Sequence, residues 1–98
     1  MTNILEAQTV YRAEIDVRRD SAQVRMDHES RIVAVEAVGE NAVDFWFTMP
    51  YHHSRQDLCL RRFAAVGTGH PFPESARYLG CSGRTPAGFV WHLLELPA

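Results

Sequence analysis

The sequence predicts a mainly β protein, a small single-domain sandwich or a barrel-like twisted antiparallel sheet of six or seven short strands. Several segments alternate apolar and polar residues with a period of two, which is typical of half-buried strands. These segments recur about every ten residues, with turn-forming residues between them. No segment combines a capping box with the long apolar period of a long helix.

The N-terminal half contains four of the expected strands. The first spans residues 8–17 and is followed, after a polar cluster, by a brief edge strand at residues 24–26. Residues 31–38 and 42–49 are apolar runs rich in β-branched and aromatic residues, and the turn residues Gly39, Glu40 and Asn41 between them predict a hairpin. A helix over residues 31–37 or at the C-terminus is the less favoured alternative.

The C-terminal half begins with a polar connection and contains three further strands. Residues 50–57 start with a proline and predict an exposed connection with a mobile tip. A strand is expected over residues 58–66, and two glycines and two prolines exclude a regular element over residues 67–73. Residues 76–81 and 88–96 supply the last two strands.

Aromatic residues at strand positions are the predicted core, since each buries a large apolar area. They are Phe45, Trp46, Phe47, Phe63, Tyr78, Phe89 and Trp91. The last strand is apolar on both faces, with Phe89, Trp91 and Leu93 on one and Val90, His92, Leu94 and Leu96 on the other. One face is therefore expected to pack in the core and the other against a second copy, which predicts a homo-oligomer.

Length and composition restrict the class of protein. The 98 residues allow one domain over residues 1–98, with residues 1–7 as a flexible N-terminal segment. The formal net charge is −2, so the chain lacks the basic field that binds duplex nucleic acid. All ten basic residues are arginines, which excludes Schiff-base chemistry and a P-loop lysine.

The location is expected to be cytoplasmic. The first ten residues lack the basic and apolar regions of a signal peptide, and no apolar run approaches the length of a membrane span, so no membrane partner is predicted. In a reducing compartment two cysteines seldom form a bridge. Cys59 and Cys81 are therefore expected to be reduced and buried.

The glycine-rich run Gly67-Thr68-Gly69-His70-Pro71 is the candidate ligand site. Its backbone amides could form a concave nest for an anion, with added charge from Arg61, Arg62 or His70, and with Trp91 or His92 supplying stacking or hydrogen bonds. It is not a GxGxxG motif, and no helix follows it. A tight turn that only joins two strands is the alternative explanation.

Other clusters carry weaker signals. No CxxC, HxxxH or HExxH motif is present, so no metal site and no cofactor are predicted. The run Asp27-His28-Glu29 is interpreted as a solvated turn rather than an acid–base cluster. Ser54, Ser75 and Ser82 lack a nucleophile elbow. No catalytic residue is therefore assigned, and the protein is not expected to be an enzyme.

Four short motifs together resemble one family. They are Arg61-Arg62-Phe63, Gly67-Thr68-Gly69-His70-Pro71, Tyr78-Leu79-Gly80 and Gly88-Phe89-Val90-Trp91-His92. From about residue 11 onward the chain resembles the small uncharacterised proteins of tailed phages and prophages, and the Gly-Thr-Gly-His-Pro run is the most specific part. The resemblance implies a viral origin and a fold class but no activity. The longer connection 50–57 and the arginine-rich stretch 18–31 depart from the family and affect only loop lengths.

Three functional hypotheses follow. The leading one is a phage-type accessory protein that captures a host protein or a small anionic ligand, as a homo-oligomer. The predicted ligand-binding residues are Arg62, Gly67, Thr68, Gly69, His70, Trp91 and His92. The second is a structural or assembly component of a virion. The third is a small hydrolase acting on a nucleotide signal, whose activity should require His70 or His92.

Overall fold

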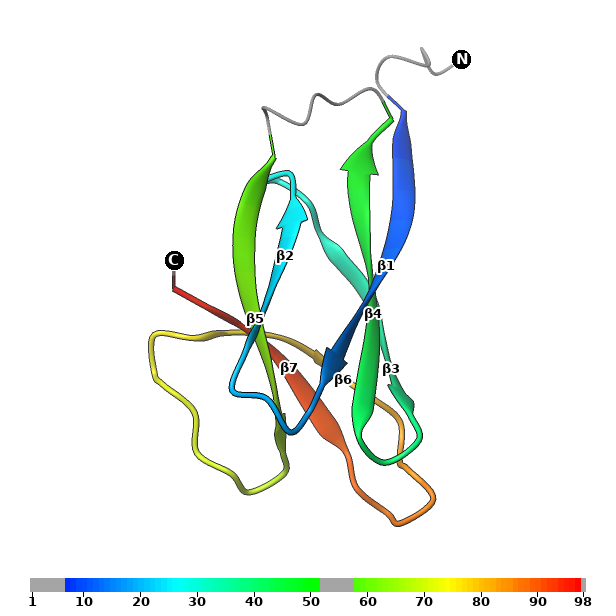
Figure 1. Ribbon diagram of the computed structural model, residues 1–98, viewed down its shortest axis with the longest axis vertical. Helices are drawn as coiled ribbons and strands as arrows, with labels where there is room; N and C mark the ends of the chain where they lie inside the picture. The colour runs from blue at the N-terminus through cyan, green and yellow to red at the C-terminus, as the bar shows by residue number, and fades with distance from the viewer. Residues whose placement is uncertain (1–6, 52–57, 98) are drawn as a thin grey trace.

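A computed structural model describes residues 7–51 and 58–97 of the chain, which form seven β-strands and no helix (Figure 1). The strands are β1 (Gln8–Asp16), β2 (Ala22–Met26), β3 (Ile32–Val38), β4 (Ala42–Pro50), β5 (Cys59–Gly67), β6 (Arg77–Cys81) and β7 (Trp91–Leu96). Each lies within one or two residues of its predicted position, except that β7 begins three residues later than expected.

The strands form two antiparallel sheets that do not close into a barrel. One sheet has the order β1-β4-β3, and the other has the order β2-β5-β7-β6. The chain leaves the first sheet after β1, enters the second as β2, and returns to the first as β3 (Figure 1). The predicted fold class, a small mainly β domain of six or seven short strands, is confirmed.

The hydrophobic core lies between the two sheets. It contains Ile15, Phe45, Phe47 and Met49 from the first sheet and Met26, Phe63 and Leu93 from the second. Five of these seven are 0 or 1% exposed. Phe45 and Phe63 meet across the sheets with ring centroids 4.9 Å apart and ring planes tilted by 45°, and this separation lies in the range of favourable aromatic pairs. Burial of this set on facing strands explains the alternation seen in the sequence.

The predicted hairpin is formed by β3 and β4. The two strands pair in antiparallel register around the turn at residues 39–41. Gly39 adopts a φ of 60°, a left-handed conformation that costs other residues free energy. The predicted edge position of the second strand is also confirmed, because β2 is one of the two edge strands of the four-stranded sheet.

The expected burial of six residues is wrong. Tyr78 and Phe89 are 51% and 57% exposed rather than core residues, because Tyr78 lies on an edge strand and Phe89 precedes β7. Trp46 and Trp91 are only half-buried. The predicted buried Cys81 is exposed, and Cys59 is half-buried; both are free thiols.

The last strand is buried on both faces, as expected, but within a single chain. Leu93 and Leu94 are neighbours whose side chains point to opposite faces, and both are 0% exposed. A second copy is therefore not needed to cover Leu94, so one argument for a homo-oligomer is removed. The oligomeric state stays a prediction.

Parts of two predicted loops lie outside the described residues. Residues 1–6 of the expected flexible segment are among them, whereas Ala7 accepts a backbone hydrogen bond of 2.8 Å from the Tyr51 amide. Residues 52–57 of the expected polar connection also lie outside the described residues, and Pro50 belongs to β4.

Within the described ranges, no helix has the length and apolar character needed to cross a membrane.

Candidate functional site

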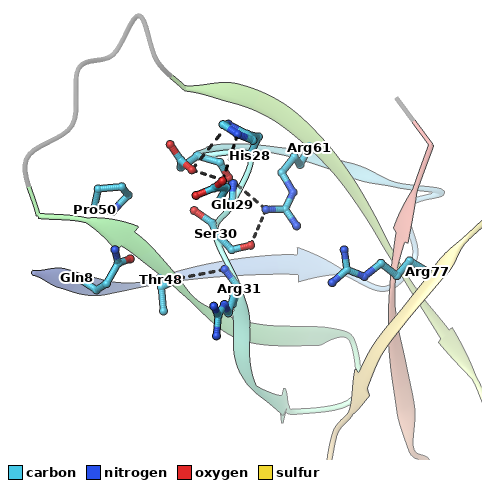
Figure 2. Close-up of a pocket in the computed structure, with 10 residues that line it drawn as sticks. Gln8, His28, Glu29, Ser30, Arg31, Thr48, Pro50, Arg61 and Arg77 are labelled. Carbon is cyan, nitrogen blue, oxygen red and sulfur yellow. Dashed lines mark hydrogen bonds and ion pairs between the residues drawn. The ribbon is translucent and has the colours of Figure 1, made fainter. Parts of the chain in front are cut away.

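A polar cavity of about 690 Å³ opens between the two sheets, at the end where the chain crosses from β2 to β3 (Figure 2). Three parts of the fold meet there: the β2–β3 connection, the ends of β1 and β4, and the inner face of the four-stranded sheet. The lining residues are Gln8, Asp27, His28, Glu29, Ser30, Arg31, Thr48, Pro50, Arg61 and Arg77. At this end of the sandwich, the space between the sheets is therefore lined mainly by polar and charged residues instead of an apolar core.

The β2–β3 connection is a tightly held turn. The Asp27 carboxylate accepts a hydrogen bond of 2.8 Å from the Glu29 amide, and the Ser30 amide donates to the Asp27 carbonyl at 3.0 Å. Ser30 is 6% exposed, and its hydroxyl contacts the Met49 sulfur at 3.4 Å. The sequence expectation of a turn at Asp27-His28-Glu29 is confirmed, and this turn forms one wall of the cavity.

Arg61 anchors that turn to the four-stranded sheet. Its Nε and Nη2 each donate to Glu95 at 2.7 Å, and its Nη1 donates to the carbonyls of Asp27 at 3.2 Å and Ser30 at 2.7 Å. The side chains of Arg61 and Glu95 are only 10% and 18% exposed. The hydrogen bonds that Arg61 donates to Glu95 raise the pKa of Arg61 above its ordinary value. Arg61 therefore remains a cation whose main role here is structural.

Arg31 and Arg77 are the remaining arginines of the cavity. Neither guanidinium group forms an ion pair or hydrogen bond within residues 7–51 and 58–97. The backbone of Arg31 is fixed, because its amide donates to the Thr48 hydroxyl at 3.0 Å and its carbonyl accepts from the Thr48 amide at 2.9 Å. Arg77 lies opposite Glu95 in the β6–β7 register. Both carboxylate oxygens of Glu95 already accept hydrogen bonds from Arg61.

The acidic turn and the two arginines without partners among the described residues, Arg31 and Arg77, lie in different parts of the cavity. His28 lies 3.9 Å from both Asp27 and Glu29 at the turn, where His28 and Glu29 are largely exposed. Figure 2 shows His28 and Glu29 together at the turn and Arg31 and Arg77 away from them. A guanidinium group recognises carboxylate or phosphate with paired, charge-assisted hydrogen bonds. The arrangement can therefore hold a small anion against the arginine side.

The residues predicted as a ligand site only partly come together. A second, smaller hollow of about 230 Å³ lies beside the glycine turn and is lined by Val66, Gly67, Thr68, Gly69, His70, Phe72, Tyr78 and His92. Five of the seven predicted residues are in this set. Arg62 is not, because it pairs with Leu96 at the other end of β5. Trp91 is not among its lining residues either, and its indole Nε1 is buried without a hydrogen-bond partner in the described part of the chain.

The glycine run forms a tight turn. The His70 amide donates to the Gly67 carbonyl at 3.1 Å, and Gly69 has a φ of 89°, as the third residue of a type II turn requires. A methyl group at Gly67 would lie 3.2 Å from the His70 ring. The turn geometry therefore explains both glycines. Whether its amides also bind an anion stays a prediction.

The sequence analysis named Arg61 only as a possible charge beside the glycine turn, and it did not single out Arg31 or Arg77 as candidate site residues. Arg61 stands two residues before the core residue Phe63, and Arg77 stands two residues before the partly buried Leu79. In a strand, residues two apart share a face, so both arginines occupy positions that face the core. A charged residue at a core-facing position is the signal that could have found them.

Within the described residues, no group of three or more histidine, cysteine, aspartate or glutamate side chains is arranged to hold a metal ion. No curated protein and no solved structure matches the chain. Residues 6–98 match a family described as a domain of unknown function, DUF7352. The match covers nearly the whole chain, so this protein belongs to the DUF7352 family.

Proposed function

We propose that this protein is a phage-type accessory binding protein that captures a small anionic ligand in the cavity between its two sheets. One observation carries the proposal. Arg31 and Arg77 face a cavity of about 690 Å³, and their guanidinium groups have no acidic partner within the described residues. Like charges at one cavity repel each other, and a bound anion would relieve that repulsion.

The surrounding structure supports binding rather than a flexible surface cluster. The Asp27–Ser30 turn and the Arg31 backbone are held by hydrogen bonds, and Arg61 ties them to the opposite sheet. A preorganised site loses less conformational entropy when its ligand binds. Arg61 itself uses four donor contacts internally, so Arg31 and Arg77 are the residues that would contact the anion.

Thermal unfolding with added anions tests this proposal, because a ligand that binds only the folded state raises Tm. The probes are inorganic phosphate, AMP and cyclic AMP. We expect at least one of them to raise Tm. Arg31→Gln and Arg77→Gln should each weaken its affinity roughly tenfold or more, as loss of a charge-assisted contact predicts.

Arg84→Gln is the matched control, because Arg84 is exposed and does not line the cavity. It should leave the affinity unchanged. The proposal is wrong if no probe raises Tm, or if the double variant of Arg31 and Arg77 binds as tightly as the original protein. Capture of a host protein would then be the leading form of the binding hypothesis.

Self-assembly, including a role as a virion component, is the second candidate. It is favoured by exposed apolar side chains on the edge strands of the three-stranded sheet: Val10 on β1 and Val33 and Val38 on β3 are 43 to 55% exposed. Exposed apolar groups on edge strands are a common route to subunit pairing. Light scattering at micromolar concentration tests this candidate, since a monomeric mass contradicts it.

A further inference from the structure

The smaller hollow lies on the outer face of the four-stranded sheet, away from the arginine cavity. Leu93 points into the core, so its neighbour His92 points to the opposite face of β7. Val66 pairs with His92 in the β5–β7 register and lines the same hollow. The glycine turn at residues 67–70 borders it. This hollow is therefore separate from the proposed anion site.

Three side chains in the hollow form a continuous hydrogen-bonded chain. The Thr68 Oγ1 lies 2.8 Å from the His92 Nε2, and the Tyr78 hydroxyl lies 2.8 Å from the His92 Nδ1. Both ring nitrogens of His92 are thus occupied by hydroxyl groups from different segments. A hydroxyl, an imidazole and a third orienting group in this order are the arrangement that activates a nucleophile.

Only one tautomer of neutral His92 can act as a base toward Thr68. Partial desolvation and the neighbouring Cys81 raise the pKa of Tyr78 above its ordinary value, so the phenol remains protonated at neutral pH. In the tautomer that can take the Thr68 proton, His92 carries its hydrogen on Nδ1 and donates it to the Tyr78 oxygen, 2.8 Å away. The His92 Nε2 is then the acceptor that faces the Thr68 hydroxyl.

The glycine turn supplies backbone donors beside the hydroxyl. Within the described residues, the amides of Thr68 and Gly69 make no backbone hydrogen bond, whereas the next amide, of His70, closes the turn. An oxyanion formed by attack of Thr68 would need such free N–H groups next to the nucleophile. Of the remaining lining residues, Val66 and Phe72 are apolar and His70 is polar, and the hollow of about 230 Å³ has room for a small uncharged group.

We propose that the Thr68–His92–Tyr78 chain is a nucleophilic site that transfers a small acyl group from an uncharged ester to Thr68 and then to water. Thr68 is the nucleophile, and His92 is the general base. Tyr78 is a positioning residue that holds the imidazole. This activity is independent of anion capture and uses a different face of the protein.

The reaction balances without a further reactant. The Thr68 oxygen attacks the ester carbonyl carbon while its proton passes to the His92 Nε2. The ester C–O bond then breaks, and the alcohol leaves with that proton, which forms an acyl-Thr68 ester. Water attacks this ester in the same way, releasing the carboxylic acid and restoring the Thr68 hydroxyl and neutral His92.

Reaction of the full chain with p-nitrophenyl acetate tests the proposal. Intact mass should show one acetyl group during turnover, and peptide mapping should place it on Thr68. Thr68→Val should abolish acetylation at this position. His92→Gln should slow it roughly 100-fold or more, the usual contribution of a general base. Ser75→Ala, a change at an exposed hydroxyl outside the hollow, should not alter the rate.

Tyr78→Phe tests the positioning role. It removes the oxygen that accepts the Nδ1–H, so the protonated imidazole loses a partner and the pH of half-maximal acetylation should move to lower values. A residue with only a structural role would lower the rate without moving this midpoint. The proposal is overturned if Thr68 is not acetylated in the original protein, or if His92→Gln is acetylated at the same rate while its thermal unfolding shows an intact fold.

Discussion

Two arginine–carboxylate pairs of similar geometry lie in very different surroundings. In the β1–β2 turn, Arg18 donates twice to Asp16 through its side chain at 2.8 and 2.9 Å. Between the sheets, Arg61 donates twice to Glu95 at 2.7 Å. The side chains of Arg18 and Asp16 are 69% and 34% exposed. Those of Arg61 and Glu95 are 10% and 18% exposed. Similar contact geometry therefore does not imply a similar contribution to stability.

The inner pair has a second task that the outer pair lacks. Arg61 also binds the carbonyls of Asp27 and Ser30, so one side chain joins β5, β7 and the β2–β3 turn. The outer pair joins residues only two apart in the chain, and solvent screens it. The comparison suggests that Arg61 and Glu95 hold the cavity wall in place, whereas Asp16 and Arg18 only order a turn.

The largest effect is expected from Glu95→Ala. The change leaves the Arg61 guanidinium nearly buried without its counter-ion, and breaking such a pair costs about 3 kcal/mol of unfolding free energy. Urea unfolding at neutral pH measures it. Glu74→Ala, at an exposed glutamate, is the control and should be near neutral. Equal stability of the two variants would remove the distinction between the two pairs.

A smaller effect is expected from Arg61→Lys. Lysine keeps the positive charge but cannot donate in parallel to Glu95 and also reach two carbonyls. We expect a loss of about 1 to 2 kcal/mol in unfolding free energy, from hydrogen bonds to charged and carbonyl groups that are not replaced. Urea unfolding again provides the measurement. A variant as stable as the original protein would mean that charge alone, and not the forked geometry, matters at this position.

The smallest effect is expected at the outer pair and should depend on pH. Hydrogen bonds from Arg18 lower the pKa of Asp16 from 3.8 to about 2. The folded state therefore favours the ionised carboxylate, which stabilises the protein above pH 4 and stops doing so as the pH falls toward 2. Asp16→Asn should be slightly less stable at neutral pH and equal to the original protein at pH 2, by urea midpoints at low salt.

High salt gives an independent test of the outer pair. Added salt screens exposed charges far more than partly buried ones. The difference between Asp16→Asn and the original protein should shrink in 1 M salt, whereas the effect of Glu95→Ala should persist. If both differences shrink equally, the inner pair is as accessible to solvent as the outer one.

The strands could be predicted because local pattern and burial agree. Ile15 and Phe45 occupy alternate positions of apolar runs, and both face the core, as the period of two requires. The division into two sheets could not be predicted. Pairing of β1 with β4 rather than with β2 depends on long-range packing, which no local pattern records.

The candidate sites were predicted less well than the fold. The glycine turn drew attention through its residue types, and His92 and Thr68 do meet there, although 24 residues separate them. The larger cavity was not predicted because, in the sequence, Arg61 and Arg77 look like ordinary polar residues of a strand. The face that Arg61 shares with Phe63 was a usable signal. That the two arginines border one cavity depends on how the sheets pack, which is a property of the tertiary structure.

Two open sheets leave four edge strands, and two of these are irregular. The register shifts between Ile32 and Ala34 on β3 and between Tyr78 and Gly80 on β6. Gly80 has a φ of 154°, a conformation that side chains rarely adopt. An interrupted edge is a poor template for another chain. We therefore expect regular strand addition, as in a fibril, to be disfavoured at β3 and β6, so that any contact through Val33 or Val38 would be made by side chains rather than by backbone pairing.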